Sequence, residues 1–103
     1  MREIDAHQLE QVLDAGTQLI DVREPGEYVG GHVPGAVLIP MGQLTARLGE
    51  LDRTAPVHLI CASGIRSGAM ADLLAAAGFD AVNVAGGTSA WARSGRPLES
   101  GRR

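Results

Sequence analysis

The chain has 103 residues, 45% of them hydrophobic, which suits one domain spanning residues 1–103, with residues 97–103 expected as a loosely ordered tail. Nine Lys and Arg residues are scattered among twelve Asp and Glu, so no basic stripe exists and we expect no nucleic-acid partner. No apolar stretch reaches the length of a signal peptide or membrane span, so we also expect no membrane partner.

The first forty residues predict a helix followed by two strands. Asp5 is a good N-cap residue, apolar side chains follow at helical spacing, and Gly16 is expected to end the helix. Apolar runs at residues 18–22 and 36–39 predict buried strands. Between them, residues 23–35 are rich in glycine and proline, so this segment is predicted to be irregular, with a single helical turn.

The second half continues the alternation of helices and strands. Leucines at helical spacing predict a helix over residues 44–51, which ends before Pro56. A later helix is expected to end at Gly78, and a short last helix to begin at residues 86–87. Together with a short first strand, the predicted strands are 3–4, 18–22, 36–39, 57–60 and 80–84. This order predicts an α/β fold with a parallel sheet, in which ligands bind at the carboxyl ends of the strands.

The only cysteine, Cys61, lies where the strand at residues 57–60 gives way to a helix. The N–H groups of such a turn and the positive end of the helix dipole stabilise an anion, and a thiol placed there has a pKa of roughly 3.5–7.5. We therefore predict a thiolate nucleophile. A lone cysteine also indicates a reducing compartment, so we expect a cytoplasmic protein. The alternative is an inert thiol in the core.

Four separated segments span nearly the whole chain: 21–28 (DVREPGEY), 31–36 (GHVPGA), 61–67 (CASGIRS), and 86–91 (GGTSAW) with 95–97 (GRP). Together they resemble the rhodanese-like sulfurtransferases. The resemblance implies a five-stranded, mainly parallel sheet flanked by helices on both faces. It also implies that Cys61 becomes a persulfide. The sulfane sulfur would come from thiosulfate or another small-molecule or protein persulfide donor and pass to a thiol or cyanide, with no cofactor.

The loop after the cysteine is expected to bind the anionic sulfur through its backbone N–H groups; its residues are Ala62, Ser63, Gly64, Ile65, Arg66 and Ser67. Two roles are open to Arg66, because it can attract an anionic donor or brace the loop against a carboxylate. Ser67 either donates a hydrogen bond to the thiolate or caps the next helix, and we favour the cap. Ala62 stands where many thiosulfate enzymes have a basic residue, so weak attraction of the donor is expected.

Three polar residues outside the loop are expected to support it. The resemblance suggests that Asp21 and Arg23 form a buried network, and His32 is interpreted as a hydrogen-bonding strut in its turn rather than a general base. Glu27 is interpreted as a solvated charge. The three histidines lack the spacing of metal ligands, so no metal site is expected.

Two other functions compete with sulfur transfer. Rhodanese folds also serve as interaction or sulfur-relay modules, but such modules usually lose the cysteine that this chain keeps. Phosphatases and arsenate reductases of related design place five residues between cysteine and arginine, whereas here four residues separate Cys61 from Arg66. The shorter loop suits a single sulfur atom better than a phosphoryl group, so the sequence favours a sulfurtransferase.

Overall fold

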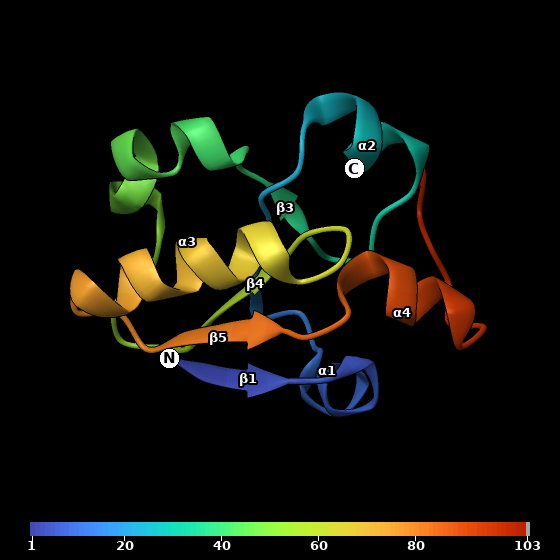
Figure 1. Ribbon diagram of the computed structural model, residues 1–103, viewed down its shortest axis with the longest axis horizontal. Helices are drawn as coiled ribbons and strands as arrows, with labels where there is room; N and C mark the ends of the chain where they lie inside the picture. Colours follow the sequence, from blue (N-terminus) through green and yellow to red (C-terminus); the bar gives the residue numbers. More distant parts are fainter. Residues whose placement is uncertain (103) are drawn as a thin grey trace.

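The computed structural model describes residues 1–102, whose centre is a five-stranded sheet (Figure 1). The strand order is β1-β5-β4-β2-β3, and every pair of neighbouring strands is parallel. The strands are β1 (Arg2–Ile4), β2 (Gln18–Asp21), β3 (Val37–Leu38), β4 (Val57–Ile60) and β5 (Ala81–Val84). The predicted α/β class and strand count are confirmed, and the sheet is entirely rather than mainly parallel.

Helices cover both faces of this sheet, as expected. They are α1 (Ala6–Val12), α2 (Pro25–Gly30), α3 (Ile65–Ala76) and α4 (Gly87–Arg93), with two 3-10 helices, η1 (Met41–Gln43) and η2 (Thr45–Glu50). Figure 1 shows α3 lying along β4 and β5, while α1 and α4 lie beside each other away from α3. Two apolar cores result, one on each face of the sheet.

The central strand β4 divides these two cores. All four of its residues are buried, and side chains point alternately to the two faces of a strand. Leu59 packs with Ile20 and Leu74 in one core, whereas Ile60 packs with Leu19 and Trp91 in the other. Such a strand has no solvated face, which is typical of the centre of a parallel sheet. It carries the following residue, Cys61, directly into the interior.

Two predicted helices differ from the structure. The helix expected over residues 5–16 ends at Val12, because the Asp14 carboxylate accepts the Gly16 N–H at 2.8 Å and the Thr17 hydroxyl donates to the Val12 carbonyl. Such side-chain bonds compete with helix propagation. The helix expected over residues 44–51 is instead the 3-10 helix η2, which is interrupted by a non-helical conformation at Arg47, and η1 precedes it.

The C-terminal segment also differs from the expected loose tail. The Trp91 indole donates to the Pro97 carbonyl at 2.7 Å, and Glu99 pairs with His32 through two backbone hydrogen bonds. The Gly101 N–H donates to the Val29 carbonyl at 2.8 Å. The contacts of Glu99 and Gly101 join backbone groups far apart in sequence, so no local sequence pattern predicts them. The prediction of a loose tail was wrong for residues 97–101, and residue 103 lies outside the described residues.

Candidate active site

Cys61 directly follows the last residue of β4, at the carboxyl end of that strand. Figure 1 shows the loop that leads from β4 into α3. Cys61 is only 1% exposed. The Gly64 N–H donates to Sγ at 3.1 Å, and the Ser67 hydroxyl lies 3.3 Å from it. Burial raises the pKa of the Cys61 thiol, but bonds from the Ser67 hydroxyl and from the Ser67, Gly64 and Ser63 amides outweigh it. The pKa therefore lies below its ordinary value.

Gly64 makes the tight turn that aims these amides at the sulfur. Its φ of +99° lies in the left-handed region that favours glycine. A Cβ at this position would also lie 3.2 Å from the Gly86 nitrogen and 3.3 Å from the Val84 carbonyl oxygen. The next residue, Ile65, is 80% exposed and begins α3. The loop thus turns one side to the sulfur and presents an apolar tip to solvent.

The start of α4 holds the other side of the loop. The Cys61 carbonyl accepts the Thr88 N–H at 2.8 Å and the Thr88 hydroxyl at 3.1 Å, while the Ala62 carbonyl accepts the Ser89 N–H at 3.0 Å. A Cβ on Gly87 would lie only 2.4 Å from the Cys61 carbonyl oxygen. Because these bonds turn the carbonyls away from the sulfur, the loop amides are left to face it. Residues 86–91 form one of the four sequence segments noted above, but no role in the site was predicted for them.

Arg66 braces the loop against Glu27 on α2. Its two terminal nitrogens donate to the two carboxylate oxygens of Glu27 at 2.8 and 2.9 Å. The guanidinium hydrogen bond lowers the pKa of Glu27 to about 2, and the same bond raises the pKa of Arg66. Of the two roles open to Arg66, the structure shows bracing. The interpretation of Glu27 as a solvated charge was wrong, because Glu27 is paired with Arg66. The pair was not foreseen, since the two residues lie 39 positions apart in sequence.

Asp21 and Arg23 form a buried ion pair. The Arg23 terminal nitrogen lies 2.8 Å from an Asp21 carboxylate oxygen and also donates to the Gly31 carbonyl at 2.8 Å. Asp21 ends β2 next to Ile60, the residue before the cysteine. The pair therefore ties the turn after β2 to the end of the sheet that carries Cys61.

His32 is buried in a stack with Tyr28. The two rings are 3.7 Å apart and nearly parallel, and His32 Nδ1 lies 2.8 Å from the Tyr28 carbonyl oxygen. On its other side Nε2 lies 3.9 Å from a Glu99 carboxylate oxygen. These contacts suit the predicted strut, which connects α2 to the C-terminal segment.

Ser67 lies inside α3 rather than at its cap. The helix begins at Ile65 with Gly64 as its N-cap, so the favoured capping role was wrong. The Ser67 hydroxyl lies 2.6 Å from Asn83 Oδ1 as well as 3.3 Å from the sulfur. Asn83 was missed at the sequence level, although it is the polar residue of an otherwise apolar strand.

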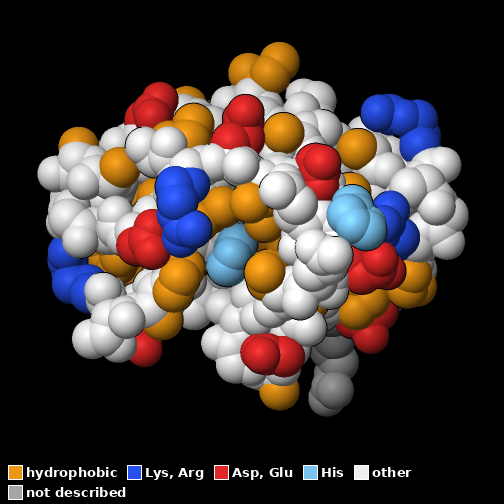
Figure 2. Space-filling view, turned by 90° about the horizontal axis from the view of Figure 1, so that it is seen from below, with side chains coloured by type: hydrophobic (Ala, Val, Ile, Leu, Met, Phe, Trp, Pro, Cys, Tyr) orange, Lys and Arg blue, Asp and Glu red, His pale blue; other side chains and the backbone are white. Residues whose placement is uncertain are grey.

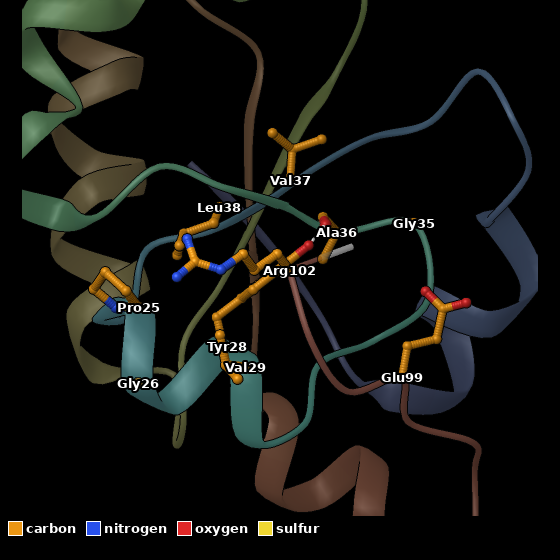
Figure 3. A pocket seen from close by; sticks show the side chains of 10 residues that line it. All are labelled: Pro25, Gly26, Tyr28, Val29, Gly35, Ala36, Val37, Leu38, Glu99 and Arg102. Atoms are coloured by element: carbon orange, nitrogen blue, oxygen red, sulfur yellow. Dashed lines mark hydrogen bonds between the residues drawn. The ribbon is translucent and has the colours of Figure 1, made fainter.

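Two hollows lie near this end of the sheet. A small one borders the loop and is lined by Ala62, Thr88 and Glu27, among others. A larger groove of about 740 Å³ lies between α2 and the edge strand β3, and Figure 3 shows Arg102 reaching across it. No residue of the 61–67 loop lines the larger groove, so we place the chemistry at the small hollow.

Some charges elsewhere on the surface form ion pairs. On the face shown in Figure 2 basic and acidic side chains lie next to one another, and Arg2–Asp80 and Arg96–Glu10 are ion pairs. Within residues 1–102, no helix is both long and apolar enough to span a membrane, and no three His, Cys, Asp or Glu side chains gather as metal ligands.

Comparison with known families identifies this arrangement. The profile described as Rhodanese-like domain matches residues 5–94, which is most of the chain. The chain belongs to the rhodanese family. This finding confirms the resemblance carried by the four sequence segments.

Relatives of similar length carry sulfurtransferase names. "Putative sulfurtransferase YtwF" of Bacillus subtilis is 37% identical over 99 residues, covering 94% of this chain and 96% of the relative. "Sulfurtransferase" of Allochromatium vinosum is 37% identical over 102 residues, covering 95% and 94%. Other relatives are longer, and the chain spans 60% of "Uncharacterized protein YqhL" and 50% of "Putative sulfur carrier protein YrkF", both of Bacillus subtilis.

Solved rhodanese structures share the fold. A rhodanese-related protein from Thermoplasma volcanium superposes with a TM-score of 0.90 at 33% identity, covering 96% of this chain and 98% of that one. A rhodanese-like domain protein from Staphylococcus aureus gives a TM-score of 0.86 at 35% identity, covering 97% and 98%. The rhodanese sheet and its flanking helices are therefore present in full in this chain.

Proposed function

We propose that this rhodanese domain transfers a sulfane sulfur through a persulfide on Cys61. The observation that carries the proposal is the set of donors around Sγ, with the Gly64 N–H at 3.1 Å and the Ser67 hydroxyl at 3.3 Å. Donors of this kind favour the thiolate, which is the nucleophilic form of cysteine. Relatives named as sulfurtransferases and as a putative sulfur carrier support the same chemistry.

The first half-reaction loads the enzyme. The Cys61 thiolate attacks the outer sulfur of thiosulfate, a new S–S bond forms, and sulfite leaves with the electron pair of the old bond. The negative charge then sits on the terminal sulfur of the persulfide, one atom farther from Sγ. The amides of Ser63, Gly64 and Ser67, which act on the thiolate, are suited to this charge as well.

The second half-reaction empties the enzyme. A thiolate acceptor or cyanide attacks the terminal sulfur, and the bonding pair returns to Cys61 as a thiolate. No external oxidant or reductant is needed, because the same sulfane sulfur passes from the donor to Cys61 and then to the acceptor. The two steps predict ping-pong kinetics. A protein persulfide would serve as donor by the same step. Because the reaction starts from a free thiolate, it suits the reducing cytoplasm.

The phosphatase alternative is less well supported by the site. Both terminal nitrogens of Arg66 already donate to Glu27, whereas a phosphoryl group would require such donors for its own oxygens. With four residues between Cys61 and Arg66, the loop has few amides to surround three oxygens. An interaction module without chemistry would need neither the lowered pKa of Cys61 nor its ring of donors.

The test is the intact mass of the protein after brief exposure to thiosulfate or glutathione persulfide. We expect a gain of one sulfur atom that cyanide removes, and no gain in Cys61→Ser with its fold retained. Wild-type protein that gains no sulfur from either donor would contradict the proposal. Hydrolysis of an aryl phosphate at a rate comparable to sulfur transfer would favour the phosphatase instead.

A further inference from the structure

A line of buried polar groups connects the edge strand β1 to the reactive sulfur. The Asn83 side chain on β5 is 2% exposed, and its Nδ2 donates to Glu3 Oε2 at 2.9 Å and to the Gly64 carbonyl at 3.2 Å. The Ser67 hydroxyl lies 2.6 Å from Asn83 Oδ1 and 3.3 Å from Cys61 Sγ. Asn83 thus touches both the loop turn and the hydroxyl that faces the sulfur.

The orientation of the Asn83 amide is fixed by its neighbours. Each hydrogen of Nδ2 faces an acceptor, namely the Glu3 carboxylate and the Gly64 carbonyl. Turning the amide over would point Oδ1 at those two acceptors and leave it repelled by both. Oδ1 therefore faces Ser67, where it can only accept a hydrogen bond.

The Ser67 hydroxyl has one hydrogen and two acceptors within reach. When Cys61 holds its proton, the thiol donates to Ser67 Oγ and the hydroxyl donates to Asn83 Oδ1, so every group has a partner. When Cys61 is a thiolate, the sulfur accepts the hydroxyl hydrogen, and Oδ1 loses its donor at a buried site. A buried acceptor without a donor is costly, so Asn83 opposes the thiolate.

We propose that Asn83 is a positioning residue that competes with the Cys61 sulfur for the single Ser67 hydrogen. It takes the hydrogen back whenever Sγ is neutral, both in the thiol and in the persulfide, whose charge lies on the outer sulfur. The persulfide part rests on the proposed function, whereas the thiol part does not. The charged groups around the network are Glu3 on β1, Glu27 on α2 and Arg66 on α3, and none of them changes in the test.

The test measures the pKa of Cys61 from the pH dependence of its alkylation by iodoacetamide, which needs no sulfur donor. Asn83→Leu keeps the approximate size and removes the competing oxygen. The Gly64 carbonyl still accepts the Gly68 N–H at 3.1 Å, and the exposed Glu3 carboxylate can bind water. Neither acceptor is therefore left without a hydrogen-bond donor. We expect the pKa to fall by about one pH unit, the equivalent of one buried hydrogen bond.

A double-mutant cycle separates competition from a merely structural role. In a Ser67→Ala background there is no hydrogen to compete for, so Asn83→Leu should leave the pKa of Cys61 unchanged. A structural role would loosen the loop and raise the pKa in both backgrounds. A rise, an unchanged pKa, or an equal fall with and without Ser67 would overturn the proposal. If Asn83→Leu does not fold, Asn83→Ala replaces it, and the same directions of change in the pKa of Cys61 are expected.

A matched control removes an amide at the opposite end of the sheet. Gln18→Leu breaks hydrogen bonds to Asp52 and its neighbours at the start of β2, far from the carboxyl strand ends. It should leave the pKa of Cys61 unchanged. If Cys61 gains no sulfur but its pKa changes as expected in the variants, the proposed function is refuted and the role of Asn83 is not. The failure of one proposal is therefore distinguishable from the failure of the other.

Discussion

Replacement of Gly87 by alanine tests whether the start of α4 holds the reactive loop in place. The added Cβ would lie 2.4 Å from the Cys61 carbonyl oxygen and 2.6 Å from that of Ala62. Contacts under 3.0 Å essentially never occur for a real Cβ, so the loop and helix must separate by several tenths of an ångström. The same two carbonyls accept the Thr88 and Ser89 amides, and these bonds would lengthen.

Two contributions make up the expected loss of stability. The left-handed backbone at Gly87, with φ +58°, costs about 1–2 kcal/mol for alanine. Weakening the two backbone hydrogen bonds adds about 1 kcal/mol for each. Gly95 is the matched control, since its φ is +80° but a Cβ there has nothing within 4 Å. We therefore expect Gly87→Ala to lose about 2 kcal/mol more than Gly95→Ala.

The two variants should also differ in activity. A displacement of about 1 Å at a nucleophile costs on the order of 100-fold in rate. The several tenths of an ångström expected for Gly87→Ala should therefore cost part of that, whereas Gly95→Ala leaves the loop untouched. Urea unfolding gives the free energies, and the rate at which Cys61 gains sulfur from thiosulfate gives the activity. Equal stability and equal loading rates in the two variants would show that the contact between Gly87 and the loop has no consequence.

Three further predictions concern charged and titratable groups. The alkylation rate of Cys61 should level off below the free-cysteine pKa of about 8.5, and a rate still rising beyond it would contradict the thiolate. Arg66→Lys should slow transfer at least about tenfold, measured as kcat, because lysine cannot make both bonds to Glu27. The Arg66–Glu27 ion pair is about one-third exposed, so we expect Arg66→Lys to reduce the free energy of unfolding by only about 0.3–1 kcal/mol. Burial lowers the pKa of His58, so the unfolded chain gains a proton near pH 6.5 while the folded chain does not. Stability should fall as the pH drops below about 6.5; urea midpoints at pH 7.5 and 5.5 test this, and His58→Gln should remove that part of the slope.

The parts of the fold that were predictable from sequence depend on short-range patterns. The apolar run before Cys61 and the turn at Gly64 after it predicted the place of the candidate nucleophile at the end of a strand. The strand bounds were accurate to within one residue, because glycine or proline lies near most strand ends. Where a side chain competed with the backbone, as at Asp14, the apolar spacing predicted a helix that the structure ends early.

The supporting contacts of the site were not predictable in the same way. Glu27 and Arg66 are 39 residues apart, and Asn83 and Glu3 are 80 residues apart, so only the folded sheet brings them together. The prediction for Ser67 failed for a related reason. Capping is a local rule, but Gly64 already occupies the cap, and the hydroxyl points to a strand later in the chain.

The charges around the site indicate how it holds an anion. Arg66 is neutralised by Glu27 and Arg23 by Asp21, while Ala62 carries no charge at all. The remaining attraction for a sulfur anion comes from backbone N–H groups and one hydroxyl, whose fields fall off faster with distance than that of a net charge. Such a site stabilises a charge that has already arrived but does little to draw a dianion from solution. We therefore expect this loop to favour donors that are delivered by contact over free thiosulfate.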